Sequence, residues 1–146
     1  MIKFELLTAN DIPEIVNHMV AFYAIDVYPI HVEKTTQLFH EFITKPELGS
    51  CFVIKYNNEI CGYTILIQFF SFEMSGYVLL LDELYISDSY QGKGIGKEAM
   101  AFIKEFASNN RYKKLVLEVE PHNERAIHLY EKENFRKHKR DLMLFP

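Results

Sequence analysis

The chain has 146 residues, of which 49% are hydrophobic and 25% charged, and its formal net charge is −4. This length predicts one domain over residues 1–146, and the composition is typical of a soluble globular protein. The negative charge provides no basic field for nucleic acid or an anionic membrane, and no stretch approaches the ~18 apolar residues of a membrane span. We therefore expect a cytoplasmic protein without a nucleic-acid or membrane partner.

The first third of the chain predicts a strand followed by two helices. Residues 2–7 alternate like a strand, and a helix begins near Asn10 or Asp11, with Pro13 in its first turn, where a missing N–H costs nothing. The apolar face of this helix has a period of 3.6 residues and consists of Ile12, Ile15, Val16, Met19, Val20 and Tyr23. A second helix is expected at residues 33–44.

Three strands are expected next. Those at residues 51–56 and 60–69 are joined through Asn57-Asn58, which suits a tight hairpin turn because Asn tolerates left-handed dihedrals. The third, residues 77–86, is apolar on both faces except at Asp82-Glu83, which favours a place inside the sheet.

The last third predicts two helices and the remaining strands. An amphipathic helix runs from about Ile95 to Asn109, a strand covers residues 114–119, and another helix carries Ala126 and Tyr130. Residues 135–145 are expected to close the chain with one or two short strands. The elements together predict a single α/β (α+β) domain with a mixed sheet.

The cysteines and histidines give no sign of a metal site. Cys51 and Cys61 each lie in an apolar, strand-like run, and we interpret them as reduced core residues. Neither has a nearby His partner, and the six histidines show no metal-ligand spacing, so no bound metal is expected.

A glycine-rich segment precedes the amphipathic helix. Three of the six glycines fall within five residues, in Gln91-Gly92-Lys93-Gly94-Ile95-Gly96. Glycine lets backbone N–H groups approach a ligand without a Cβ in the way, and a helix start adds unpaired donors and partial positive charge. The segment therefore predicts an anion site, most naturally for phosphate; the alternative is a loop that only caps the helix.

Two common phosphate-binding motifs do not fit. A P-loop would need glycine where Gln91 stands, and Ser or Thr where Glu98 stands. Gly94 to Ala99 satisfies the dinucleotide pattern G-x-G-x-x-A, with Glu118 as a candidate ribose acid. However, seven residues separate the preceding strand from Gly94, and only 28 follow Glu118, too few to complete a doubly wound sheet.

A third pattern does fit. The strand ending at Ile86, followed by Q-x-x-G-x-G and a helix, resembles the signature of the GCN5-related N-acetyltransferases (GNAT). Downstream, Asn123, Ala126 and Tyr130 resemble the family's N-x-x-A-x-x-x-Y segment, which usually ends in Gly-Phe where this chain has Asn134-Phe135. Asn is the next-best left-handed C-cap after glycine, so the departure is modest. The good match covers about residues 79–135.

The resemblance implies the GNAT fold, a mixed sheet splayed at its central strands and flanked by helices, with acetyl-coenzyme A in the gap. The residues that the resemblance assigns to the coenzyme are Leu84, Tyr85, Ile86, Gln91, Gly92, Lys93, Gly94, Ile95, Gly96, Lys97, Asn123, Ala126 and Tyr130. Main-chain amides of the glycine segment would bind the pyrophosphate, and an N–H between Leu84 and Ile86 would polarise the thioester carbonyl.

The chemistry needs a base for the amine. A lysine-like amine has a pKa of about 10.4, so a carboxylate near the pocket has to accept its proton, directly or through water. Glu83 is the favoured candidate and Asp82 the other. Strand alternation places them on opposite faces unless the strand is bulged there, as it is in the resembling family. A purely structural role for both stays open.

Tyr130 matches the family's usual proton donor for the departing thiolate. Because a phenol of pKa ~10 is a weaker acid than a thiol of pKa ~8.5, we expect a hydrogen bond to the thiolate rather than early proton transfer. The alternative is a core aromatic residue beside Ala126 and Ile127.

The expected function is transfer of acetyl to a small-molecule or peptide amine. Leu81 to Ile86 is similar to the acidic strand of polyamine acetyltransferases, which favours a small cationic acceptor. A non-catalytic coenzyme-binding sensor is the main alternative, and a pure interaction domain would leave the glycines unexplained. A homodimer is also expected. The segment Phe69 to Phe72 is expected in core or dimer packing, with a wall of the substrate site as the alternative.

Overall fold

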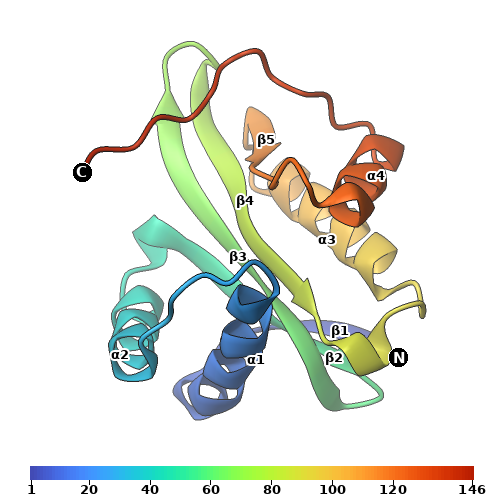
Figure 1. Ribbon diagram of the computed structural model, residues 1–146. Helices are drawn as coiled ribbons and strands as arrows, with labels where there is room; N and C mark the ends of the chain where they lie inside the picture. Colours follow the sequence, from blue (N-terminus) through green and yellow to red (C-terminus); the bar gives the residue numbers. More distant parts are fainter.

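The computed structural model, which describes residues 1–146, contains one five-stranded mixed sheet with helices on both faces (Figure 1). The strands follow each other in chain order across the sheet: β1 (Ile2–Leu6), β2 (Gly49–Tyr56), β3 (Glu59–Ser71), β4 (Gly76–Ile86) and β5 (Lys114–Leu117). All neighbouring pairs are antiparallel except β4 and β5, which are parallel. The mixed α/β class is confirmed.

Helices α1 (Ile12–Ile25) and α2 (Val32–Ile43) lie on one face of the sheet, and α3 (Ile95–Asn109) and α4 (Glu124–Lys132) lie on the other (Figure 1). Short 3-10 turns at Ala9–Asp11, Pro46–Leu48 and Asp88–Tyr90 precede α1, β2 and the glycine segment. No helix combines the length and apolar character needed to cross a membrane.

The local signals in the sequence act as expected. Pro13 lies in the first turn of α1, and Asn57 and Asn58 have φ angles of 52° and 69° in the β2–β3 turn. Asn134 takes the left-handed conformation (φ 70°) after α4, and the N–H of Phe135 bonds back to the Tyr130 carbonyl at 3.0 Å. Asn134 therefore replaces glycine in a Schellman C-cap without loss of its geometry.

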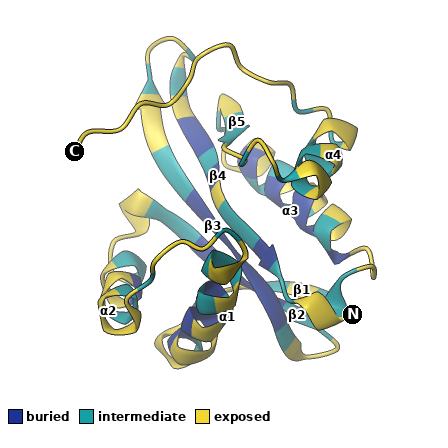
Figure 2. Ribbon diagram, in the orientation of Figure 1, coloured by how far each residue is buried: buried dark blue, intermediate teal, exposed yellow.

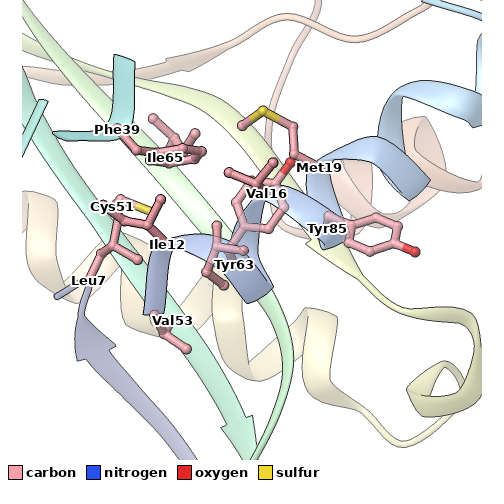
Figure 3. Close-up of a cluster of buried hydrophobic side chains, with 11 residues drawn as sticks. Leu7, Ile12, Val16, Met19, Phe39, Cys51, Val53, Tyr63, Ile65 and Tyr85 are labelled. Atoms are coloured by element: carbon pink, nitrogen blue, oxygen red, sulfur yellow. The ribbon is translucent and has the colours of Figure 1, made fainter. Parts of the chain in front are cut away.

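The core has one apolar cluster under α1 and α2 and two under α3. Buried residues occur along the strands and on the helices that cover them (Figure 2). The cluster under α1 combines residues of that helix, including Ile12, Val16 and Met19, with Tyr63 of β3 and other strand residues (Figure 3). Leu66, Leu79 and Leu81 face α3 instead. Cys51 and Cys61 are buried free thiols in the strands, and burial raises the pKa of the Cys51 thiol to about 12.

The expected strands at residues 135–145 do not form. This segment is extended along the surface and has no ladder with β5 or any other strand, and the Arg140 guanidinium pairs with Glu73 at the β3–β4 turn. A strand is stable only when its backbone groups find a partner, and alternation in the sequence did not reveal that no partner strand is adjacent. The prediction was wrong for this reason.

The sheet splits between β4 and β5. Their parallel pairing begins at Val78 opposite Lys114 and stops at Leu81 opposite Leu117, whereas β4 itself continues to Ile86. The last five residues of β4 therefore have β3 as a partner on one side and nothing from β5 on the other. The splayed sheet expected from the sequence is present at this place.

Candidate active site

A cavity of about 540 Å³ occupies the split between β4 and β5. Its wall on the sheet is formed by Leu81 to Leu84 of β4, and its opposite wall by Glu118 to Glu120, which follow β5, and by α4. The turn after α1 completes it through Asp26, Tyr28 and Pro29. A concave site of this size at a break in a sheet can enclose part of a small molecule.

A β-bulge shapes the sheet wall of the cavity. Ile65 lies opposite Glu83 and Leu66 lies opposite Leu81, so Asp82 is an extra residue on β4. Leu81 packs towards α3, and strict alternation would turn residue 83 the same way. The bulge instead places Glu83 on the α1 face. The Thr64 hydroxyl stabilises the bulge by donating a hydrogen bond of 2.9 Å to the Glu83 carbonyl.

Two tyrosines hold the Glu83 carboxylate. Tyr23 of α1 and Tyr63 of β3 each donate a hydroxyl hydrogen bond of 2.7 Å, one to each carboxylate oxygen. Burial raises the pKa of Glu83, and these two hydrogen bonds to its charged form partly oppose the rise. A partly buried carboxylate with a raised pKa is suited to accept a proton near neutral pH.

Asp82 lies in the same cavity but has no hydrogen-bond partner in the protein. Its side chain is open to solvent in the cavity, yet the surrounding protein atoms raise the pKa of its carboxyl, and the nearby Glu118 carboxylate adds to this. A base at either Asp82 or Glu83 is therefore compatible with the geometry. Glu83 differs from Asp82 in being fixed by partners on two elements.

Helix α4 supplies the opposite side of the cavity. Asn123 caps this helix by accepting from the Ala126 N–H at 3.1 Å, and Asn123, Ala126 and Tyr130 all line the cavity. The Tyr130 ring packs edge-on against Phe135, and its hydroxyl bonds to no protein group. Burial raises the pKa of Tyr130, so the phenol keeps its proton and is available as a donor.

The glycine segment forms the turn before α3 and is not part of the cavity wall. Gly92 and Gly94 both have a φ of 78°, and an added Cβ at either would meet nothing within 4 Å. Glycine is therefore needed at both positions for backbone conformation, while the space around them is open. A Cβ at Gly96 would approach the Leu129 side chain at 3.6 Å, an ordinary contact with α4.

Six consecutive amides of this segment have no backbone acceptor. The N–H groups of residues 92–97 make no hydrogen bond within the protein, and the first amide to find a partner is that of Glu98, which bonds to the Gly94 carbonyl at 3.1 Å. Such a row of donors, with the positive end of the α3 dipole behind it, is suited to bind phosphate groups.

Arg125 is a residue at this segment that the sequence reasoning missed. Its guanidinium donates to the Gln91 side-chain oxygen, while the Gln91 amide nitrogen donates to the Ile86 carbonyl at 3.3 Å and to Asp88 at 3.2 Å. Gln91 thus organises the turn from within, and Arg125 adds a positive charge beside it. The Lys93 ammonium lies 5.7 Å from the centre of the Tyr56 ring, and Lys97 is exposed.

The structure brings six of the fifteen expected site residues together in the cavity. Asp82, Glu83 and Leu84 share one cavity with the α4 residues. The Tyr85 side chain instead packs in the α1 cluster against Phe22, and Ile86 packs near Ile95, so only their main chain can serve the cavity.

The turn after α1 also contributes to the site. Asp26 pairs with the His122 imidazole at 2.7 Å, and the Tyr28 hydroxyl donates to Glu120, so this turn is joined to the segment before α4 across the split. These contacts lie about 90 residues apart in sequence, and no local pattern could have indicated them. For Tyr23 the sequence did contain a signal of a polar contact, because its hydroxyl lies on an otherwise apolar helix face.

Comparison with known sequences gives one family. The family model described as the acetyltransferase (GNAT) family matches residues 13–135. A curated relative from Bacillus subtilis (strain 168), the uncharacterized N-acetyltransferase YhfO, is 30% identical over 83 residues, which cover 57% of this chain and 56% of the relative. The match thus spans little more than half the length of that relative.

Solved structures show the same fold. A possible acetyltransferase from Clostridium difficile 630 has a TM-score of 0.87 at 17% identity, covering 100% of this chain and 97% of that one. A predicted acetyltransferase from Clostridium acetobutylicum, solved with acetyl-CoA, has a TM-score of 0.81 at 15% identity, covering 99% and 96%. The family model matches most of this chain, and the split sheet and the glycine turn agree with that match. The chain belongs to the GNAT family of acetyltransferases.

Proposed function

We propose that this protein transfers an acetyl group from acetyl-coenzyme A to a primary amine. The observation that carries the proposal is the cavity at the β4–β5 split, which has a fixed carboxylate, Glu83, on one wall and the unpartnered hydroxyl of Tyr130 on the other. Acyl transfer to an amine needs a proton acceptor on the side of the nucleophile and a donor on the side of the leaving group.

Coenzyme A fits the residues present. The free amides of residues 92–97 would hold the pyrophosphate, with Arg125 and the α3 dipole adding positive potential. Asn123, Ala126 and Tyr130 line the cavity from α4, and Leu84 lines it from β4, so the acyl end would lie between these elements. When bound, acetyl-coenzyme A supplies the activated acetyl thioester.

Groups of the protein then accept the proton of the amine and donate hydrogen bonds to the reacting atoms. The amine nitrogen forms a bond to the acetyl carbon as the carbon–sulfur bond breaks, and the proton lost by nitrogen passes to the Glu83 carboxylate, directly or through water. Beyond Leu81, amides on the open edge of β4 have no β5 carbonyl to bond and can donate to the carbonyl oxygen of the thioester. The Tyr130 hydroxyl donates to the sulfur as it becomes negative.

The acceptor in this proposal is an amine that is cationic in solution, and small polyamines belong to that class. The supporting observation is that the lining of the cavity contains no lysine or arginine but five carboxylates: Asp26, Asp82, Glu83, Glu118 and Glu120. Unlike charges attract strongly in a partly enclosed site, so this lining favours an ammonium group over an anionic or neutral acceptor.

The test is a panel of primary amines incubated with acetyl-coenzyme A while thiol release is measured. We expect release to depend on the amine and the acetylated product to appear in equal amount. A protein that binds coenzyme A, shown by a raised Tm, but releases no thiol with any amine would instead be a binding module.

We also propose that the chain forms a homodimer. Support comes from apolar side chains that the monomer leaves uncovered: Phe72, Leu142, Met143, Leu144 and Phe145 are 71–98% exposed. Exposed apolar surface of this kind often marks a contact between proteins.

A further inference from the structure

A second cavity, of about 240 Å³, lies between α1, α2 and the sheet. Its lining comes from α1, α2, β3 and β4 and includes no residue of α3 or α4. Helices α1 and α2 lie on the face of the sheet opposite α3 and α4 (Figure 1). Most of its lining is apolar: Met19, Leu38, Phe39, Phe42, Ile65 and Ile67, with Thr35 at its border.

Three residues belong to both cavities. Tyr23, Asp82 and Glu83 line the α1–α2 cavity as well as the one at the split, so they form a common wall. The bulge produces this arrangement, because it sets two successive residues of β4 where both sides of the sheet can reach them. The α1–α2 cavity therefore adjoins the carboxylates to which the proposed function assigns the amine.

The apolar lining is not fully covered by the protein. Leu38 is 49% exposed although it borders the cavity, and Phe42 and Ile67 are only partly buried. Apolar surface left next to a pair of carboxylates is complementary to a molecule with an amine at one end and an apolar body behind it. A second positive charge placed among these side chains would lose its hydration without gaining a partner.

We infer that the α1–α2 cavity binds the apolar body of the acceptor, and that, within the class of cationic amines, the preferred acceptors are primary amines with an aliphatic or aromatic group of about six carbons rather than polyamines. This inference rests on the proposed function. The space is sufficient, since a closed apolar cavity of roughly 150 Å³ can already bind benzene, and 240 Å³ are present here.

The experiment compares ethylamine, hexylamine and hexamethylenediamine as acceptors with saturating acetyl-coenzyme A. The first two differ only in apolar length, and the last two only in a terminal charge. We expect hexylamine to have a KM at least about tenfold below that of ethylamine, because each buried methylene adds to binding. The diamine should have the higher KM of the two six-carbon amines.

A variant pair locates the effect. Leu38→Gln puts a polar group on the cavity, whereas Val32→Gln is the matched control: Val32 is on the same helix, is 52% exposed and does not line the cavity. Both positions are exposed, so both variants should fold. Leu38→Gln should raise the KM for hexylamine about threefold to tenfold relative to the KM for ethylamine, and Val32→Gln should leave this ratio unchanged.

The outcomes separate the two proposals. Normal turnover with equal KM values for the three amines, or an equal response of both variants, would overturn the apolar subsite and leave acetyl transfer intact. A loss of dimer mass on Leu38→Gln would show that a second copy covers this face and would also overturn it. If no amine is acetylated, calorimetry with coenzyme A present decides: Leu38-dependent binding of hexylamine supports the subsite, and equal or absent binding of the amines refutes it.

Discussion

At the scale of single residues, the site depends on the contrast between two hydroxyl environments. The hydroxyls of Tyr23 and Tyr63 are committed to Glu83, whereas that of Tyr130 has no partner and faces the cavity. The first two position a carboxylate, and the third is free to meet a ligand. Conservative removal of each hydroxyl therefore has different consequences.

Tyr130→Phe should lower kcat about 10–100-fold, because a hydrogen bond to a developing thiolate, worth roughly 1.5–3 kcal/mol, acts mainly in the transition state. The Kd for coenzyme A, measured by calorimetry, should change little. Tyr112→Phe is a suitable control, since the Tyr112 hydroxyl bonds to Gln68 outside the site. Unchanged turnover in Tyr130→Phe would assign Tyr130 to packing alone.

Glu83→Gln should slow turnover by about one to two orders of magnitude at neutral pH, in the range typical of a lost general base. In the wild type, kcat/KM should fall as the pH drops through the raised pKa of Glu83, because the protonated acid cannot accept a proton. The variant should lose this dependence and should follow the free amine to higher pH. The control is Glu105→Gln, at an exposed glutamate of α3 without a partner.

The same substitution, Glu83→Gln, should raise the stability of the fold although it lowers turnover. Because burial raises the pKa of Glu83, ionisation disfavours the folded state. Wild-type stability therefore falls as the pH rises from about 4.5, the ordinary pKa of a glutamate, through the raised pKa of Glu83 in the folded state. Glu83→Gln lacks this charge. Its Tm should exceed that of the wild type above that window, and a lower Tm would mean that the two tyrosine hydrogen bonds outweigh burial.

At the scale of elements, the glycine turn can be tested by its backbone alone. Gly94→Val forces a β-branched residue into a φ of 78° and should abolish the rise in Tm produced by coenzyme A. Asn58→Val puts the same β-branched residue at a φ of 69° in the β2–β3 turn, outside the glycine segment, and should keep that rise. A folded Gly94→Val protein with an undiminished shift would remove the turn from the proposed coenzyme site.

Elements with local signals were predicted well from the sequence. Pro13, Asn57-Asn58 and Asn134 each act through their own backbone preferences, and the observed elements begin and end within about two residues of expectation. The bulge at Asp82 could be expected only through the family resemblance. The contacts of Arg125 and Tyr28 join segments remote in sequence, so no local pattern could reveal them.

At the scale of the whole molecule, the uncovered apolar surface is the main departure from expectation. Phe69, Phe70 and Phe72 are 41%, 57% and 92% exposed, which excludes the core role considered for them. The Arg140–Glu73 pair keeps the C-terminal segment beside this turn. Sequence alone could not distinguish strand from extended surface segment here, since both alternate.

Removal of residues 142–146 tests the proposed dimer. In light scattering, the full chain should have twice its monomer mass of 17.2 kDa. The shortened chain should form a weaker dimer, which dissociates at a higher protein concentration than that of the full chain. The reason is that four of the removed side chains are 71–98% exposed in the monomer. The Tm at high dilution should not change. A full chain that stays monomeric at high concentration would refute the dimer.

The bulge on β4 suggests how such a site could arise or be lost through the insertion or deletion of a single codon. Leu81 and Glu83 pair with consecutive residues of β3, so deleting the codon for Asp82 would leave every other β4 side chain on its present face. The shortened strand should still fold, with a regular ladder in place of the bend. Insertion of one residue into a plain strand would then be enough to place a second carboxylate, Asp82, beside Glu83 at the opening of the sheet, while the other side chains of β4 stay on their present faces.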